Sequence, residues 1–303
     1  MRKYQENYFT YIYNVDGQTF DTKVKDYLMD KFHYSSRLIR KIKREGEILV
    51  NDIKVTINEP LKANDKIVVY LGEEHIDSDP EDIPIKVIHE DDDVLVINKN
   101  PGIVTHATRS HPRGTLANAI AFYWEKNNIN AKIRFVNRLD RDTSGVIIIA
   151  KNKYAHQFIQ NEMKQDKVEK IYCALVEGIP DVEEGTIHAP IGRPYEDSIM
   201  RIVMEEGKEA ITHYKTIKKF KEHSLLEIRL ETGRTHQIRV HLKSIGHPII
   251  GDSLYNENSM QYISRQALHA NKIVFNHSRL HIPCEFKADM PRDIEEVINK
   301  LEL

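Results

Sequence analysis

Residues 137–150 read Asn-Arg-Leu-Asp-Arg-Asp-Thr-Ser-Gly-Val-Ile-Ile-Ile-Ala, and no other stretch says as much about the architecture of this chain. The second half, Val146–Ala150, is a continuous apolar run with the length of a buried strand. The charged first half is therefore expected to be a loop clamped against the core. Its carboxylates, Asp140 and Asp142, lie among arginines, which would keep a carboxylate ionised and ready to act as a nucleophile or base. A charged surface turn is the simpler interpretation of the loop taken alone.

The composition is that of a globular protein with room for two domains. The chain has 303 residues, of which 40% are hydrophobic and 30% charged. We expect no membrane association, because no apolar run approaches the roughly 20 residues that span a bilayer. The first residues show no signal-like apolar core, and Cys173 and Cys284 lack zinc-binding spacing. A cytoplasmic monomer with reduced thiols is the expectation.

The net charge of −2 hides a strongly uneven distribution of charge. Arg37–Arg44 contains five basic residues and no acid, whereas Glu73–Asp82 contains six carboxylates and no Lys or Arg. Local charge decides where a phosphate backbone can bind, so the first segment is a candidate nucleic-acid contact. An ordinary solvated helix face is the alternative for this segment alone.

A compact unit is predicted over residues 18–72, after an N-terminal extension at 1–17. Apolar residues at helical spacing predict two short helices, of which the second begins near Ser35. A hairpin at Ile48–Val55 follows, with Asn51 and Asp52 at its turn, and Ile67–Leu71 reads as a closing strand. The acidic segment 73–84, with two prolines and few apolar residues, predicts an interdomain linker.

Residues 85–303 are expected to form a second domain of the α+β class. Its strands and helices do not alternate regularly, so a mixed, largely antiparallel sheet flanked by helices is favoured over a doubly wound one. The predicted strands are Val94–Asn98, Val146–Ala150, Lys170–Val176, Ile211–Thr216 and Leu225–Leu230. The predicted helices are Thr115–Lys126, Ala155–Lys164, Thr235–Ile245 and Asp293–Leu301.

A second polar cluster begins at Thr232, where a strand ends and a helix starts just after Gly233. Arg239 on this helix is either part of a basic surface or the partner of a buried carboxylate. His236 and His241 lie five residues apart, whereas helical zinc pairs lie three or four apart, so no metal is expected. Tyr172, taken singly on its strand, is most simply a core residue.

Six stretches, in order along the chain, together resemble the RluA-type family of pseudouridine synthases. These are 99–102, 137–145, 170–178, 233–242, 246–255 and 265–277, and the resemblance covers about residues 85–290. Asn137 stands where the family has His, and Asn100 interrupts the usual Lys-Pro. The basic helix and hairpin of the 18–72 unit likewise resemble the S-four type of RNA-binding domain.

This resemblance implies a pseudouridine-synthase fold and the isomerisation of uridine in structured RNA, without a cofactor. Ribosomal RNA is the favoured substrate and transfer RNA the alternative. Asp140 would be the catalytic carboxylate, which either attacks carbon 1′ or removes the proton from carbon 2′. Arg239 would pair with it, and Tyr172 would lie against the uracil and could assist proton loss at carbon 5. The residues implied in RNA binding are Arg138, Arg234, His236, Gln237, Ile238, Arg37, Arg40, Lys41 and Arg44.

Two other functions remain open on sequence grounds. A noncatalytic RNA-binding protein would retain RNA and form no pseudouridine. A carboxylate-based nucleoside or glycoside hydrolase would need a second catalytic carboxylate, for which Asp142 is the candidate, and would release a free base.

Overall fold

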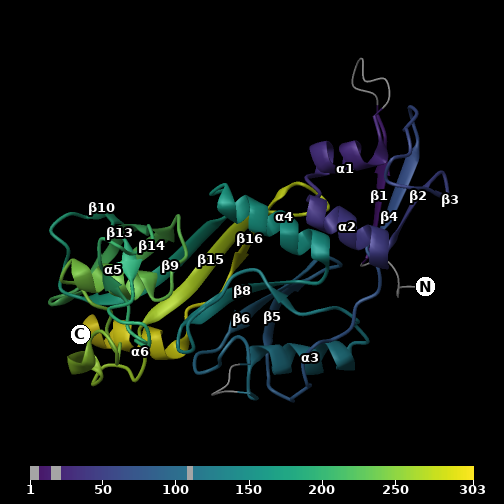
Figure 1. Ribbon diagram of the computed structural model, residues 1–303. Coiled ribbons are helices and arrows are strands. Elements are labelled where there is room, and N and C mark those ends of the chain that lie inside the picture. Colours follow the sequence, from purple (N-terminus) through teal and green to yellow (C-terminus); the bar gives the residue numbers. More distant parts are fainter. Residues whose placement is uncertain (1–6, 15–21, 108–111) are drawn as a thin grey trace.

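The computed structural model describes residues 7–14, 22–107 and 112–303, which form a small N-terminal unit and a larger body (Figure 1). We use "small unit" for residues 8–72 and "body" for residues 85–303. The body is built on a ten-stranded sheet with the order β10-β13-β14-β9-β15-β8-β6-β5, to which β16 and β7 are added at β15 and β8. Only the β8–β15 pairing is parallel among the pairings of the described strands. The prediction of a mixed, largely antiparallel α+β sheet is confirmed.

The strands of the body are β5 (Lys86–Glu90), β6 (Val94–Lys99), β7 (Arg134–Phe135), β8 (Ser144–Ala150), β9 (Glu169–Glu177), β10 (Glu184–His188), β13 (Ile211–Lys219), β14 (His223–Leu230), β15 (Leu268–Asn276) and β16 (Pro283–Lys287). A separate two-stranded hairpin is formed by β11 (Ile191–Gly192) and β12 (Ile202–Val203). The helices are α3 (Leu116–Lys126), α4 (Lys153–Lys164), α5 (Gln237–Ser244), α6 (Arg292–Leu301) and the short 3₁₀ helix η1 (Glu257–Ser259).

The central strands β6 and β8 are buried on both faces because helices cover each side. Leu95 and Ile147 belong to the cluster that packs on α3, whereas Val94 and Ile148 belong to the cluster that packs on α4. This division follows from the alternation of side chains across a strand. The continuous apolar run after the charged loop is therefore a strand buried on both faces, as its sequence predicts.

The predicted elements of the body are all present, with ends that differ by up to three residues. β13 continues to Lys219, and α5 begins at Gln237 rather than Thr235. The late start of α5 has a local cause, because His236 adopts a left-handed conformation with φ of 58° and cannot lie inside a right-handed helix. α5 and α6 pack in the same hydrophobic cluster as β9 and β14.

The small unit has a four-stranded sheet with the order β1-β4-β2-β3 and two helices. Its elements are β1 (Tyr8–Ile12), α1 (Val24–Phe32), α2 (Ser36–Glu45), β2 (Glu47–Val50), β3 (Ile53–Lys54) and β4 (Lys66–Tyr70). Ser35 caps α2 by accepting a hydrogen bond from the Leu38 amide. Asn51 and Asp52 both have positive φ, as a two-residue hairpin turn requires.

The N-terminal extension predicted at 1–17 is not separate from this sheet over the residues that the structure describes. Residues 8–12 form β1, which pairs antiparallel with β4 from Tyr8 to Ile12. Residues 1–6 and 15–17 of the predicted extension lie outside the described residues. Every residue of β1 is uncharged, and the Phe9 side chain enters the core.

The acidic segment predicted as a linker at 73–84 contains no helix or strand, but it lies against the body. Glu74 is buried, and its carboxylate binds Arg134 through two hydrogen bonds of 2.5 and 2.6 Å. Ile76 and Ile83 pack against the cluster on α3. The segment that joins the two units therefore also finds partners on the body for a few of its side chains.

None of the helices in the described ranges combines the length and apolar character that crossing a bilayer requires.

Candidate active site

The charged loop lies between β7 and β8, and its backbone is held by hydrogen bonds from several elements. Thr105 Oγ1 donates to the Leu139 carbonyl, and the Thr143 amide donates to the Asp140 carbonyl. Lys99 Nζ donates at 2.8 Å to the next carbonyl, that of Arg141. Each of these backbone acceptors is satisfied, so Asp140 is carried by a fixed loop and not by a mobile surface turn.

The end of the loop is anchored where β8 meets β15. Ser144 Oγ lies 3.0 Å from His269 Nδ1, and the Gln266 amide donates to Thr143 Oγ1 at 3.2 Å. Gly145 has a φ of 119°, and a Cβ at this position would lie 2.2 Å from the Ala270 carbonyl oxygen. Only glycine allows the two parallel strands to approach this closely.

Asn137, the departure from the family pattern, continues the pairing of the loop with β8 through its side chain. Its Oδ1 accepts from the Ile148 amide at 2.8 Å, and its Nδ2 donates to the Val146 carbonyl at 3.1 Å. A side-chain amide can give and accept a hydrogen bond at once, as a backbone peptide group does. Asn137 therefore holds the entry to the loop.

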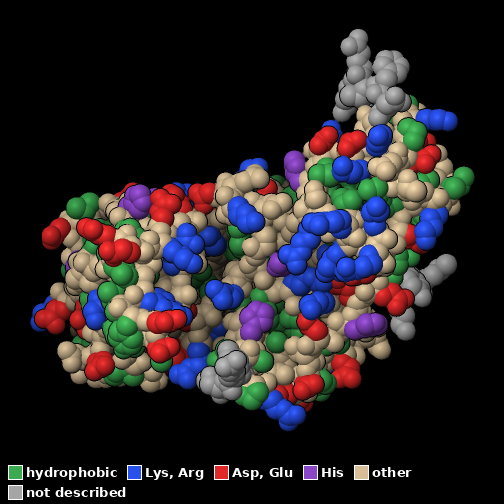
Figure 2. Space-filling view, in the orientation of Figure 1, with side chains coloured by type: hydrophobic (Ala, Val, Ile, Leu, Met, Phe, Trp, Pro, Cys, Tyr) green, Lys and Arg blue, Asp and Glu red, His purple; other side chains and the backbone are tan. Residues whose placement is uncertain are grey.

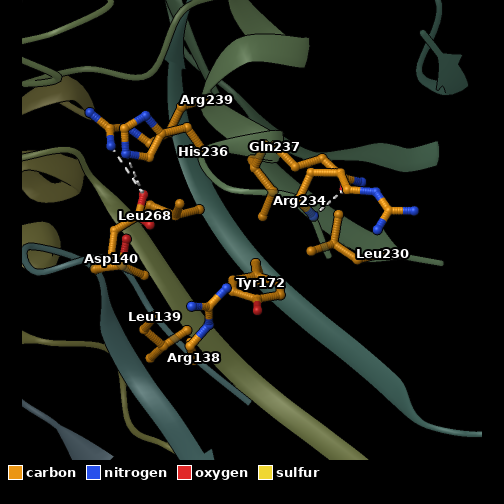
Figure 3. Close-up of a pocket in the computed structure, with 12 residues that line it drawn as sticks. Arg138, Leu139, Asp140, Tyr172, Leu230, Arg234, His236, Gln237, Arg239 and Leu268 are labelled. Carbon is orange, nitrogen blue, oxygen red and sulfur yellow. Dashed lines mark hydrogen bonds and ion pairs between the residues drawn. The ribbon is translucent and has the colours of Figure 1, made fainter. Parts of the chain in front are cut away.

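Asp140 points into a pocket and is paired with Arg239 of α5 (Figure 3). Arg239 Nη1 donates to Asp140 Oδ2 at 3.0 Å, and His236 Nε2 lies 3.8 Å from the same oxygen. The Asp140 side chain is 28% exposed, so one side of the carboxylate stays accessible from the pocket. The predicted pairing of Arg239 with a carboxylate of this loop is present in the structure.

Arg239 is shared with a second carboxylate that sequence reasoning did not single out. Asp252 is fully buried and binds Arg239 Nε and Nη2 at 2.7 and 2.8 Å. The Tyr255 ring lies under the guanidinium at 4.9 Å from its centroid. Burial opposes the charge, but the hydrogen bonds and charges of Asp252 and Asp140 raise the pKa of Arg239 above its usual value.

His236 lines the pocket as a neutral imidazole at neutral pH. Burial lowers its pKa, against the opposing effect of the nearby Asp140 charge. Its Nδ1 lies 2.9 Å from the Tyr255 hydroxyl, which orients the ring. The positive charge beside Asp140 therefore comes from Arg239.

Gln237, which was predicted to bind substrate, holds the turn before α5 with its side chain. The Gln237 amide uses all its hydrogen-bonding capacity inside the protein, with Thr232, Arg234, Ile211 and Thr212 as partners. Gln237 lines the pocket, but we assign its polar atoms to holding this turn and not to substrate binding.

Two neighbours of Gln237 were also predicted to bind substrate. Ile238 is buried and contributes an apolar surface to the pocket. The Arg234 side chain is directed away from Asp140 in Figure 3, and its Nε donates to the Glu209 carbonyl. Both residues line the pocket, Ile238 with an apolar surface and Arg234 with a side chain directed away from Asp140.

Tyr172 and Arg138 lie on the far side of the pocket from α5. Tyr172 is 8% exposed, and burial raises its pKa, so the phenol stays protonated at neutral pH. Arg138 is exposed, extends towards Tyr172 in Figure 3, and makes no hydrogen bond or ion pair with the rest of the described chain. Apolar surface is added by Leu139, Leu230, Ile238 and Leu268. The pocket thus combines a carboxylate, a flat aromatic ring and apolar walls.

Two basic residues that were not predicted as site residues hold the backbone of the loop. Lys99 is 1% exposed, and burial lowers its pKa to about 7. Arg265 donates to the Asp142 carbonyl at 3.1 Å and pairs with Asp293. Lys99 lies within a quoted sequence match, but its role depends on contacts with residues about 40 positions away, which no local pattern reveals.

The predicted RNA-binding residues of α2 lie outside this pocket. Arg37, Arg40 and Arg44 are exposed on α2, and Lys41 is half-buried. Figure 2 shows basic side chains gathered over α2, with more of them around the hollow beside α4 on the same face. The structure therefore presents the basic helix and the hollow to the same side of the molecule.

His236 and His241 do not converge. His241 Nδ1 lies 2.9 Å from Thr212 Oγ1, and its Nε2 lies 2.9 Å from the Ala189 carbonyl, away from Asp140. Within the described ranges, no three His, Cys, Asp or Glu side chains are grouped so as to hold a metal ion.

Comparison with known proteins relates the whole chain to one family. The model of the family described as RNA pseudouridylate synthase matches residues 93–244. The RNA pseudouridine synthase YjbO of Bacillus subtilis is 37% identical over 278 residues, which cover 91% of this chain and 98% of that protein. The ribosomal large subunit pseudouridine synthase D of Buchnera aphidicola is 32% identical over 318 residues, which cover 99% of this chain and all of that protein.

Solved structures show the same likeness at the level of the fold. Human RNA pseudouridylate synthase domain containing 4 superposes with a TM-score of 0.59 and 20% sequence identity, over 72% of this chain and 93% of that one. Human RNA pseudouridylate synthase domain containing 1 gives a TM-score of 0.56 with 23% identity, over 72% of this chain and 95% of that one.

Proposed function

The chain belongs to the family of RNA pseudouridylate synthases, isomerases that convert uridine in RNA to pseudouridine, and we propose that Asp140 is its catalytic carboxylate. The observation that carries this proposal is the ion pair of 3.0 Å between Asp140 and Arg239 at the wall of a partly apolar pocket. Arg239 fixes the orientation of the Asp140 carboxylate. Asp252, the second partner of Arg239, holds the guanidinium in place when substrate binds.

The reaction needs an anion beside the ribose and no net change in atoms. The bond from carbon 1′ to nitrogen 1 of uracil breaks, the base turns, and a bond from carbon 1′ to carbon 5 forms. The hydrogen on carbon 5 is then lost, and nitrogen 1 gains a proton. Asp140 either attacks carbon 1′, in a bond that breaks again when carbon 5 bonds to carbon 1′, or removes the proton from carbon 2′ and returns it when the new bond has formed. Both routes place its free oxygen against the sugar.

A uridine in structured RNA has to leave the base stack to reach Asp140. Flipping a base out costs a few kcal/mol, which contacts in the enzyme have to offset. Arg138 supports this step, because its guanidinium is exposed at the pocket entrance and free of partners among the described residues. We propose that the Arg138 side chain fills the position in the RNA base stack that the flipped uridine leaves empty.

Tyr172 holds the flipped base within the pocket. A base stacked on an aromatic ring gains about 1–3 kcal/mol. The apolar neighbours Leu230 and Ile238 exclude water from the same surface. Burial keeps the Tyr172 phenol protonated, so we assign its ring to stacking and give its hydroxyl no role as the base that removes the proton from carbon 5.

The hydrolase alternative lacks the second carboxylate that it needs. Asp140 is the one acidic residue among the described residues that line the pocket with Tyr172 and Arg239. Asp142 is instead held by Arg141 through hydrogen bonds of 3.1 and 3.2 Å. This arrangement favours isomerisation, in which the base is never released to water.

Ribosomal RNA of the large subunit is the substrate that we propose, acted on in the cytoplasm by a monomer. Two relatives of high coverage, from Buchnera aphidicola and Xylella fastidiosa, carry the name ribosomal large subunit pseudouridine synthase D. The exposed arginines of α2 give affinity for a phosphate backbone without base specificity.

Mapping of pseudouridines in RNA tests this function and its substrate. Ribosomal and transfer RNA are compared between cells with the gene, cells without it, and cells complemented with Asp140→Asn. We expect one or more ribosomal positions to lose pseudouridine in the deletion and to regain it only with the wild-type gene. An unchanged map, or a change confined to transfer RNA, would contradict the proposed substrate.

A further inference from the structure

The helix α4 carries contacts that fix the small unit on the body. Gln157 of α4 caps the turn between α1 and α2, because its Nε2 donates to the His33 carbonyl at 2.6 Å and its Oε1 accepts from the Ser35 amide at 3.0 Å. The Tyr154 hydroxyl donates to the Phe32 carbonyl at 3.0 Å. These backbone groups lie at helix ends, where the small unit itself cannot satisfy them.

Charged side chains close the same junction at the end of α2. Lys153 of α4 lies 2.6 Å from Glu45 of α2 and 3.4 Å from Glu74 of the acidic segment. Glu74 also binds Arg134 of β7, which precedes the charged loop. The Lys153 and Glu74 side chains are 9% and 5% exposed, so this network is largely removed from water. Separating a pair of charges is costly in such a buried position.

A second junction joins β1 to the body. Arg279 donates to the Tyr8 carbonyl at 2.7 Å and to the buried carboxylate of Asp93 at 2.7 Å. Its guanidinium lies 4.1 Å from the centroid of the Phe9 ring. The small unit is therefore held on two sides, by elements that are far apart in the sequence.

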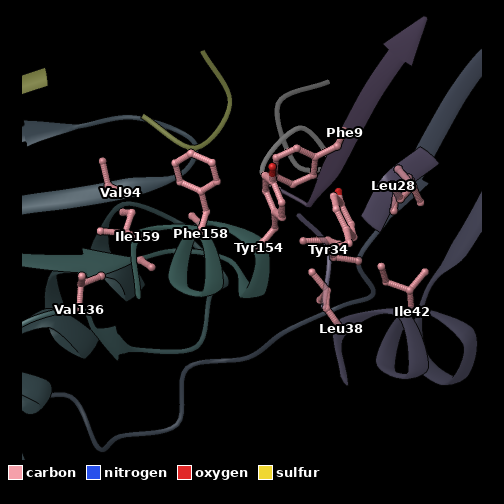
Figure 4. Packing of buried hydrophobic residues seen from close by; sticks show 14 of the residues in the cluster. Phe9, Leu28, Tyr34, Leu38, Ile42, Val94, Val136, Tyr154, Phe158 and Ile159 are labelled. Atoms are coloured by element: carbon pink, nitrogen blue, oxygen red, sulfur yellow. The ribbon is translucent and has the colours of Figure 1, made fainter. Parts of the chain in front are cut away.

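The hydrophobic core runs through this junction without a break (Figure 4). Leu28 and Ile42 of the small unit belong to the same buried cluster as Val94 and Ile159 of the body. Tyr154 lies between the two groups in Figure 4, and its ring stacks on Tyr34 at a centroid distance of 4.6 Å. Units joined by a flexible tether would not share one dry core.

The other end of α4 lines the groove that leads to the proposed catalytic residue. Gln160 and Met163 line this groove together with Asp140, Arg138 and Tyr172. The helix α4 has twelve residues and is therefore about 18 Å long. Its first turns contact the small unit, and its last turns line the groove.

We propose, on the basis of the function proposed above, that the small unit is docked and not tethered, so that α2 and the groove form one rigid surface for a structured RNA. The phosphate backbone of the RNA lies on α2, and only a uridine at a fixed spacing from that contact reaches Asp140. Tyr154 and Gln157 are then positioning residues that determine specificity and touch neither the reacting atoms nor the RNA.

The double variant Tyr154→Phe/Gln157→Ala tests this proposal on two RNAs. One is a transcript of the RNA domain that contains the mapped uridine. The other is a stem-loop that contains the same uridine but is too short to reach α2 when the uridine is in the pocket. We expect kcat/KM on the transcript to fall about tenfold or more. The contact between α2 and the RNA has a lower effective concentration when the position of α2 relative to the groove is no longer fixed. We expect kcat/KM on the stem-loop to stay unchanged.

Gln261→Ala is the control, since Gln261 is exposed and lies outside α2, α4 and the residues that line the groove. It should leave both RNAs unaffected. Equal turnover of the transcript by the double variant and the wild type would overturn the docking proposal. Absence of turnover by the wild-type protein on both RNAs would overturn the proposed function itself, so the two failures are distinguishable.

A distance measurement tests docking without relying on a destabilised variant. Spin labels are placed at Lys54→Cys in the small unit and Arg292→Cys in the body, in a Cys284→Ser background. Both side chains are exposed, at 71% and 89%. We expect one narrow distance distribution in the free protein, unchanged when the transcript is bound. A broad distribution in the free protein would overturn the proposal.

Discussion

At the scale of single residues, Arg239 is the centre of the site because it joins the partly exposed carboxylate of Asp140 to the buried carboxylate of Asp252. Asp252 binds the guanidinium through two nitrogens and leaves the third for Asp140. The sequence singled out Asp140 and Arg239 from their motifs. It gave Asp252 no role, because a carboxylate 13 residues beyond Arg239 becomes its partner only through the turn after α5.

Asp252→Asn should lower both stability and activity. Breaking a buried ion pair leaves an unmatched charge and costs about 3–5 kcal/mol. The freed guanidinium should also lose its orientation towards Asp140. Urea unfolding and tritium release from uridine labelled at carbon 5 measure the two effects. Asp289→Asn, which removes an exposed pair with Lys86, is the control, and a variant at Asp252 that matches it in both assays would contradict the assignment.

Tyr172→Ala should weaken substrate binding, and Tyr172→Phe should not. The loss of a stacking ring is worth about 1–3 kcal/mol, or roughly a 5- to 160-fold rise in KM. The ring is retained in the Phe variant, and its kcat reports separately whether the hydroxyl takes part in proton loss. Steady-state kinetics on RNA give both constants. An unchanged KM for the Ala variant would exclude a stacking role.

At the scale of elements, local patterns predicted the helices and strands well. The apolar run of β8, the amphipathic spacing of α2 and the Asn51–Asp52 turn each appear where sequence periodicity places them. The start of α5 was placed two residues early, because the left-handed conformation of His236 depends on the turn that Gln237 holds. Such turns are fixed by contacts between elements, which periodicity does not contain.

The triple variant Arg37→Ala/Arg40→Ala/Arg44→Ala should reduce the salt dependence of RNA binding. Each phosphate contact that is removed lowers the slope of log K against log salt by about one. Binding should weaken for all RNA sequences alike, because phosphate contacts carry no base information. Titrations at several salt concentrations measure the slope. Arg292→Ala, on the exposed face of α6, is the control. A slope equal to that of the wild type would exclude α2 as an RNA contact.

At the scale of the whole molecule, the relation between the two units could not be predicted from the sequence. The acidic composition of 73–84 predicted a linker, but it did not reveal that Glu74 within this segment is buried and paired with Arg134. Arg279 contacts Tyr8 across 271 residues of chain, a pairing that no window of sequence contains. The family of the chain was recognisable because motifs survive in order, whereas the packing between units leaves no motif.

The segment 277–279, whose Arg279 binds β1, should make the free energy of unfolding depend on pH. Burial opposes protonation of His277, but the hydrogen bond and charge of Asp91, with Asp93 nearby and Arg279 opposing, raise its pKa above 6.5. Because the pKa is raised in the folded state, the stabilisation is fully present below the unfolded value and is lost as the pH rises through the folded value.

His277→Asn should therefore flatten the loss of stability above pH 6.5 relative to the wild type. Urea unfolding at a series of pH values measures the free energy of unfolding for both proteins. Parallel curves for the two proteins would show that His277 does not titrate with folding.

The most direct test of the catalytic assignment is tritium release from RNA labelled at carbon 5 of uridine, measured for the wild type and for Asp140→Asn. The substitution keeps the size of the side chain and removes its charge. We expect release to fall to background while RNA binding and the urea unfolding midpoint stay close to those of the wild type. Continued release by the folded Asp140→Asn protein would contradict the role of Asp140 in the chemistry.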